Sequence, residues 1–118
     1  MIDFDAWLHV FAVNSLAPAM IAAALKDNLL KGGEKKLVTI TSQLGSTTHH
    51  SGGLYPYYAS KAAVNNFMRG LSLEWARDGI AVGLFHPGWV QTDMGGQSAP
   101  VTPEQSVNGL RQGSSWLA

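Results

Sequence analysis

The sequence predicts an α/β fold, as part of a doubly wound sheet whose strands run parallel. Two observations carry this expectation. Helical and strand patterns alternate in the order helix, strand, helix, strand, helix, and both strand patterns are short and contain β-branched residues. A strand, a long helix and a second strand form one right-handed βαβ unit. Parallel sheets usually have more than two strands and are covered on both faces, so we expect residues 1–118 to form a single partial domain.

Apolar residues recur at helical spacing from Phe4 to Leu30, which predicts a first helix. Asp3 can cap its start, and Gly32-Gly33 can end it. Pro18 lies inside this helix and has no N–H to donate to the carbonyl oxygen of Asn14. We therefore expect a kink there and a carbonyl oxygen that is free to accept another hydrogen bond.

The stretch Leu37 to Thr41 is short, β-branched and bounded by a charged turn, which predicts a buried strand. Ser42 to Leu54 is polar and rich in glycine, so we expect a loop. Pro56 suits the first turn of a helix that runs to about Arg77. Gly79 is the expected C-cap of that helix.

A second strand is predicted over Ile80 to Phe85. His86 to Val101 contains two prolines and three glycines, which favours another loop. Thr102 and Gln105 have the spacing of a capping box, with a proline at the first helical position. A short last helix should follow, to about Gln112.

Composition excludes several classes of function. Eight Lys plus Arg balance eight Asp plus Glu, so no basic excess points to nucleic acid. The longest apolar stretches contain charged residues or Pro within about 18 residues, so we expect no membrane span. The start lacks the basic region of a signal peptide. The absence of Cys removes disulfides and thiol catalysis, and we expect a cytoplasmic protein.

The strongest chemical signal is the pair Tyr57 and Lys61, which lie one helical turn apart on one face. A nearby ammonium stabilises a phenolate, so such a tyrosine can exchange a proton with an alcohol or a carbonyl oxygen. Tyr55 and Tyr58 are alternatives, but neither stands four residues before the lysine. A pair with this spacing is more often two surface neighbours, so the pair needs support from other residues.

Ser42 gives that support, because it stands where the first strand ends. Ligands bind at the carboxyl ends of parallel strands, and the second strand ends at the loop that contains Pro87 and Gly88. We expect Ser42, the start of the Tyr57 helix and this loop to open on one side. The hydroxyl could orient a substrate carbonyl, or it could make only a local turn hydrogen bond.

Other candidates carry weaker signals. His49 and His50 are adjacent in a loop with no carboxylate nearby in sequence, so we expect no metal site and interpret them as loop surface. Trp89 and Met94 could line a substrate pocket or could pack their own loop, and the sequence leaves both readings open.

Taken together, four motifs resemble the catalytic half of the short-chain dehydrogenase/reductase family, which has a Rossmann-type fold. The family's Tyr-x-x-x-Lys matches Tyr57 and Lys61. Its strand-end serine matches Ser42, its helix asparagine matches Asn14, and its Pro-Gly loop matches residues 87–92. The strings Ser-Gln-Leu-Gly-Ser and His-Pro-Gly-Trp-Val-Gln-Thr-Asp-Met-Gly-Gly are similar to the C-factor and sniffer-like branch.

The resemblance implies an oxidoreductase that moves a hydride between a nicotinamide and a small carbonyl or alcohol substrate. Tyr57 would be the general acid/base, Lys61 would assist it and hold the nicotinamide ribose, and Ser42 would position the substrate carbonyl. Asn14 would hold a relay water through its main-chain carbonyl. The implied cofactor is NAD(P), with NADP favoured over NAD. The implied cofactor-binding residues are Tyr57, Lys61, Pro87, Gly88, Val90 and Thr92.

The sequence also departs from the family, whose domain is about twice as long. The family's glycine-rich turn, which binds pyrophosphate at a helix N-terminus, belongs to an N-terminal dinucleotide-binding half. The pairs Gly32-Gly33, Gly52-Gly53 and Gly95-Gly96 do not follow a strand at the required spacing. The alternative function is therefore a non-catalytic fragment that acts through a helix-mediated interface, and the family also implies a homodimer through the two long helices.

Overall fold

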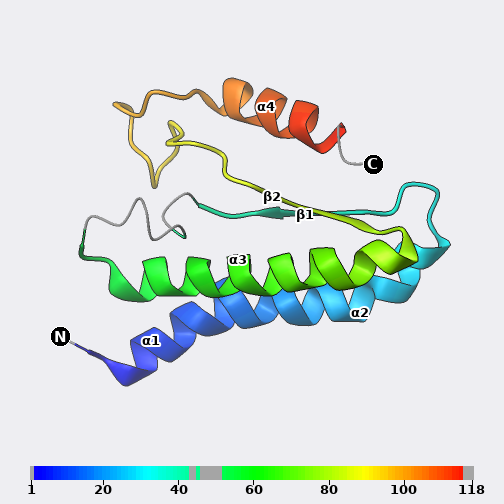
Figure 1. Ribbon diagram of the computed structural model, residues 1–118. Coiled ribbons are helices and arrows are strands. Elements are labelled where there is room, and N and C mark those ends of the chain that lie inside the picture. The colour runs from blue at the N-terminus through cyan, green and yellow to red at the C-terminus, as the bar shows by residue number, and fades with distance from the viewer. Residues whose placement is uncertain (1, 43–44, 46–51, 116–118) are drawn as a thin grey trace.

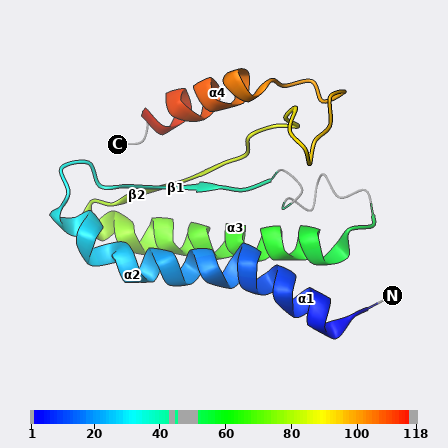
Figure 2. The same cartoon turned by 180° about the vertical axis from the view of Figure 1, so that it is seen from behind.

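The computed structural model describes residues 2–42, 45 and 52–115. Its elements in chain order are α1 (Phe4–Phe11), η1 (Ala12–Leu16), α2 (Ala17–Lys31), β1 (Lys36–Ile40), α3 (Tyr55–Trp75), η4 (Ala76–Asp78), β2 (Ala81–Phe85) and α4 (Pro103–Ser115). The two strands form a middle layer, with α2 and α3 on one side and α4 on the other (Figures 1 and 2). The predicted α/β order and the helices on both faces are confirmed.

The first helix is continuous from α1 through η1 to α2. Asp3 caps it, because its Oδ1 accepts a hydrogen bond of 3.1 Å from the N–H of Ala6. The segment η1 is a π-helix that contains Asn14 and ends two residues before Pro18. The expected kink next to Pro18 is replaced by a wider helical turn over Ala12–Leu16, so the prediction gave the place of the departure from α-helical geometry but not its form.

The sheet consists of β1 and β2, which pair in parallel with Lys36 opposite Ala81 and Ile40 opposite Phe85. The N–H of Thr41 donates to the carbonyl oxygen of Phe85 at 2.8 Å, so pairing continues one residue beyond β1. Each strand lies within one residue of its predicted bounds. Neither strand has a second partner strand in the part of the chain that the structure describes.

The helix α3 spans the sheet from end to end (Figure 1). It also supplies most of the buried cluster. It ends at Trp75, two residues before the predicted end, and continues as the 3₁₀ turn η4. Gly79 has a φ of 74° and is the C-cap, as predicted. The buried cluster joins α2, α3 and the residue before β2, and consists of Ala22, Val64, Met68, Leu71, Trp75 and Ile80.

The helix α4 begins with the predicted capping box. The Oγ1 of Thr102 accepts from the N–H of Gln105 at 3.2 Å, and the Oε1 of Gln105 accepts from the N–H of Thr102 at 2.9 Å. The helix runs three residues further than Gln112, the predicted end. Ser106 ties it to the loop after β2, because its buried hydroxyl donates to the carbonyl oxygen of Pro87 at 2.8 Å.

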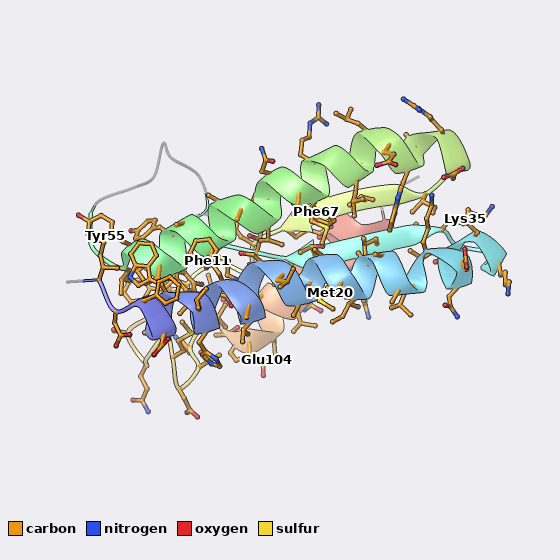
Figure 3. The ribbon with its side chains drawn as sticks, turned by 90° about the horizontal axis from the view of Figure 1, so that it is seen from below. Phe11, Met20, Lys35, Tyr55, Phe67 and Glu104 are labelled. Carbon is orange, nitrogen blue, oxygen red and sulfur yellow. The ribbon has the colours of Figure 1, made fainter. Side chains whose placement is uncertain are left out.

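The outer face of the first helix is apolar and exposed. Figure 3 views this side, with Met20 on α2 and Phe67 on α3 labelled, and Met20 is 63% exposed. The 28-residue stretch Phe4–Lys31 has an 18-residue window of mean hydropathy 1.7, which is long and apolar enough to cross a membrane. The composition argument against a span is therefore wrong for this stretch. One such helix is weak evidence for a membrane protein, because the helices of soluble proteins pass the same test.

Candidate active site

A cavity of about 730 Å³ opens at the carboxyl ends of the two strands. It is bounded by the end of β1, the first turn of α3, the loop after β2 and the start of α4. Among the residues singled out from the sequence, those that line it are Ser42, Tyr57, Pro87, Gly88, Trp89, Val90, Thr92 and Met94. The expectation that the strand ends and the α3 start open on one side is confirmed.

Tyr57 and Lys61 lie together in the first two turns of α3. The Nζ of Lys61 stands 5.7 Å from the centroid of the Tyr57 ring. Burial lowers the pKa of Lys61 below its ordinary value of 10.5, because a desolvated ammonium is less stable than a hydrated one. Tyr57 lines the cavity, whereas Lys61 does not line it and reaches it only through its position over the Tyr57 ring.

Asn14 does not line the cavity, but Ser60 connects it to the first turn of α3, where Tyr57 lies. The Nδ2 of Asn14 donates to the Oγ of Ser60 at 3.1 Å, and that hydroxyl donates to the carbonyl oxygen of Tyr57 at 2.8 Å. Ser15 adds a bond of 2.6 Å from its hydroxyl to the carbonyl oxygen of Ser60. Ser60 is fully buried, so the π-helix η1 is fastened to the first turn of α3 at this point.

The loop after β2 is folded back on itself. Val90 and Val101 form a parallel bridge, and the N–H of Gly88 donates to Nδ1 of His86 at 3.2 Å. The φ of Gly88 is 83°, a conformation that favours glycine. Gly95 has no room for a side chain, because a Cβ there would collide with the carbonyl oxygen of Val90.

Several lining residues were not singled out from the sequence as site residues. His86 and Ser106 both line the cavity. Trp89 and Met94 line it as well, and Trp89 also packs its own loop through a bond of 2.8 Å from Nε1 to the carbonyl oxygen of Gly95. Both readings left open for Trp89 are therefore correct. His49 and His50 lie outside the described residues.

The described residues suit one end of a dinucleotide. The cavity wall has apolar groups beside hydroxyls, which is the mixture that small-molecule sites use, and the Lys61 ammonium stands over the ring of one wall residue, Tyr57. A pyrophosphate needs a glycine-rich turn between a strand and a helix N-terminus. The part of the chain that the structure describes contains no such turn of the required spacing: β1 leads into the Ser42 loop, and β2 leads into the Gly88 loop.

Comparison with known proteins agrees with this geometry. The chain is 36% identical over 110 residues to the C-signal protein of Myxococcus xanthus, with 92% of this chain and 66% of that protein covered. It is 35% identical over 114 residues to a 1-hydroxy-2-glutathionyl-2-methyl-3-butene dehydrogenase of a Rhodococcus species, with 92% of this chain and 50% of that protein covered.

Solved structures give the same result. The carbonyl reductase Sniffer of D. melanogaster superposes with a TM-score of 0.90 at 31% identity, and the match covers 99% of this chain and 52% of that one. The NADPH-bound carbonyl reductase from chicken fatty liver has a TM-score of 0.89 at 30% identity, with the same coverage. The chain thus spans about half to two thirds of the length of these relatives. The similarity to C-signal and Sniffer agrees with the predicted branch.

The family described as short chain dehydrogenase matches residues 1–101, most of the chain. Together with the parallel strands, the Tyr57 helix and the cavity at the strand ends, this match shows that the chain belongs to the short-chain dehydrogenase family of oxidoreductases.

Proposed function

We propose that this chain carries the catalytic part of an NAD(P)-dependent reductase that interconverts a carbonyl and an alcohol. The observation that carries the proposal is one cavity with Ser42 and Tyr57 on its wall and the Lys61 ammonium over the Tyr57 ring. These groups can hold a substrate oxygen and supply it with a proton. The similarity to two carbonyl reductases supports the reaction class.

Tyr57 acts as the general acid/base in this proposal. Its hydroxyl donates a proton to the oxygen that develops negative charge during reduction, and takes the proton back in the reverse direction. Ser42 orients the same oxygen with its hydroxyl. The Lys61 ammonium stabilises the phenolate that remains after proton transfer. Asn14 holds a relay water through its main-chain carbonyl, beside a backbone that already departs from α-helical bonding.

NAD(P) would bind with its nicotinamide against the loop after β2, and when bound it supplies or accepts the hydride. Pro87, Gly88, Val90 and Thr92 form that wall, and Tyr57 and Lys61 would hold the ribose hydroxyls. We favour NADP over NAD, because solved relatives contain NADPH or NADP. We also propose a cytoplasmic location, which rests on the composition alone.

The test uses the protein with every residue that its gene encodes, including any before Met1. NADPH consumption is followed with a panel of aldehydes and ketones. We expect Tyr57→Phe to abolish turnover and to leave NADPH binding intact, because only the proton donor is lost. The control is Tyr55→Phe, a neighbouring tyrosine that is 49% exposed, which should keep its activity. Retained turnover in Tyr57→Phe would remove Tyr57 from this role.

The 118 residues alone should bind NADPH weakly or not at all, because the described part contains no pyrophosphate turn of the required kind. Titration by fluorescence or calorimetry would measure this. A submicromolar Kd would contradict the expectation and would locate the phosphate site within these residues.

A second candidate function is a non-catalytic role in protein association. The observation that favours it is the exposed apolar face of the long helices, where Leu16, Met20 and Ile21 are each more than half exposed. Pairing with a second copy of the chain through α2 and α3 would bury this face. Analytical ultracentrifugation tests it: a dimer that Met20→Lys dissociates would support the pairing, and a monomer at every concentration would refute it.

A further inference from the structure

A third polar side chain follows the two proposed catalytic residues along α3. Tyr57, Lys61 and Asn65 stand at intervals of four residues, so they form one stripe on the helix. Asn65 is half-buried and does not line the cavity. The mechanism proposed above gives it no role.

The contacts of Asn65 lead to the chain on both sides of Ser42. The hydroxyl of Thr41 donates to the Oδ1 of Asn65 at 2.6 Å. On the other side, a Cβ on Gly45 would collide with the Nδ2 of Asn65 and would lie 3.0 Å from the carbonyl carbon and oxygen of Lys61. Gly45 therefore approaches α3 as closely as only a glycine can.

Ser42 lies between these two contacts. The N–H of Gly45 donates to the carbonyl oxygen of Ser42 at 2.9 Å, which closes a turn that begins at the serine. Before the serine, the main chain of Thr41 is held by Phe85. The sheet thus fixes where the strand ends, and the carboxamide of Asn65 meets the chain where it leaves the strand and again at the end of the turn.

We propose that Asn65 is a positioning residue that holds the Ser42 turn against α3 and so sets the place of the Ser42 hydroxyl relative to Tyr57. The inference deepens the reductase mechanism proposed above and rests on it. Asn65 and Tyr57 lie eight positions apart on the same helix, so this arrangement links the two groups that would meet the substrate oxygen through α3. Without the contact to Asn65, the position of the Ser42 hydroxyl would depend on the conformation of the loop alone.

The kinetic test uses the protein with every residue that its gene encodes and compares Asn65→Ala, Ser42→Ala and the double variant. We expect Asn65→Ala to lower kcat by about tenfold, the value of one lost hydrogen bond, with the KM for NADPH unchanged. Ser42→Ala should lower kcat by about 100-fold. The double variant should be no slower than Ser42→Ala, because Asn65 acts through the serine. Losses that multiply would overturn the proposal.

The matched control is Asn66→Ala, the adjacent asparagine, which is exposed and should keep the kcat of the parent protein. Thr41→Val should reproduce the effect of Asn65→Ala, and Thr41→Ser should restore kcat, because it returns the hydroxyl that Asn65 accepts. If Thr41→Ser lowers kcat as much as Thr41→Val does, the hydroxyl bond to Asn65 does not hold the Ser42 turn and the proposal is contradicted.

A second readout does not depend on catalysis. In ¹H–¹⁵N spectra, Asn65→Ala should shift the amide signal of Gly45, and Asn66→Ala should leave it in place. An unchanged Gly45 signal in Asn65→Ala overturns the proposal. If the protein reduces no carbonyl compound, the proposed function fails, and these spectra still decide whether Asn65 holds the turn.

Discussion

Removal of the Ser60 hydroxyl should destabilise the protein far more than removal of a similar hydroxyl elsewhere on α3. The Oγ of Ser60 is fully buried, accepts from Nδ2 of Asn14 at 3.1 Å and donates to the carbonyl oxygen of Tyr57 at 2.8 Å. In Ser60→Ala the Asn14 amide loses its acceptor in a half-buried place. An unsatisfied buried donor costs about 1–3 kcal/mol, so we expect the free energy of unfolding to fall by about that amount.

The matched control is Ser72→Ala on the same helix. Ser72 also donates to a carbonyl oxygen three residues back, at 2.7 Å to Arg69, but this bond is exposed. Both substitutions gain the same helix propensity of about 0.5 kcal/mol, so the difference between the two variants isolates the buried contacts. Ser72→Ala should be neutral or slightly stabilising, because water replaces its bond.

Urea denaturation of the full gene product, followed by circular dichroism, measures both variants. A double-mutant cycle of Ser60→Ala with Asn14→Ala should give a coupling of about 1 kcal/mol, since the two side chains share a bond. The reasoning is refuted if Ser60→Ala and Ser72→Ala unfold at the same urea concentration. It is also refuted if the cycle shows no coupling.

Three further predictions follow from packing and charge. Met68→Ala, in the buried cluster, should lower the free energy of unfolding by about 2–5 kcal/mol, and a cost below 1 kcal/mol in urea denaturation would contradict the packing. Gly95→Ala should weaken NADPH binding, because the added methyl group would collide with the carbonyl oxygen of Val90. An unchanged Kd for NADPH in calorimetry would refute this. Burial lowers the pKa of Lys61 below 10.5. The unfolded chain therefore binds more protons between the lowered pKa and 10.5, so stability should rise with pH across that interval. Lys61→Met should remove this rise, as denaturation at several pH values would reveal.

The elements that the sequence predicts well are those set by neighbours in the chain. The Asp3 cap, the capping box at Thr102 and the Gly79 end depend on residues three or four positions apart. The parallel pairing follows from the length of the connection between the strands. These features need no knowledge of the rest of the molecule.

The features that could not be predicted from the sequence are side-chain contacts between residues far apart in the sequence. Asn14 and Ser60 are 46 residues apart, and Thr41 and Asn65 are 24 apart. Nothing in the spacing of either pair distinguishes it from many other polar pairs. Pro18 marks where the helix is disturbed, but whether the backbone kinks or widens there depends on what packs against it, and here Ser60 provides that contact.

The π-helix also determines how many side chains one site can receive from a single helix. In an α-helix, adjacent residues point in different directions and do not face a common partner. Asn14 and Ser15 are adjacent, yet both bond to Ser60. A π-turn is an α-helix with one residue inserted, and this extra residue lets two neighbours reach the same point. A variant with one residue deleted from Ala12–Leu16 would regain a regular α-helix. The deletion would rotate α1 by about 100° relative to α2. Either Asn14 or Ser15 would then lose its bond to Ser60.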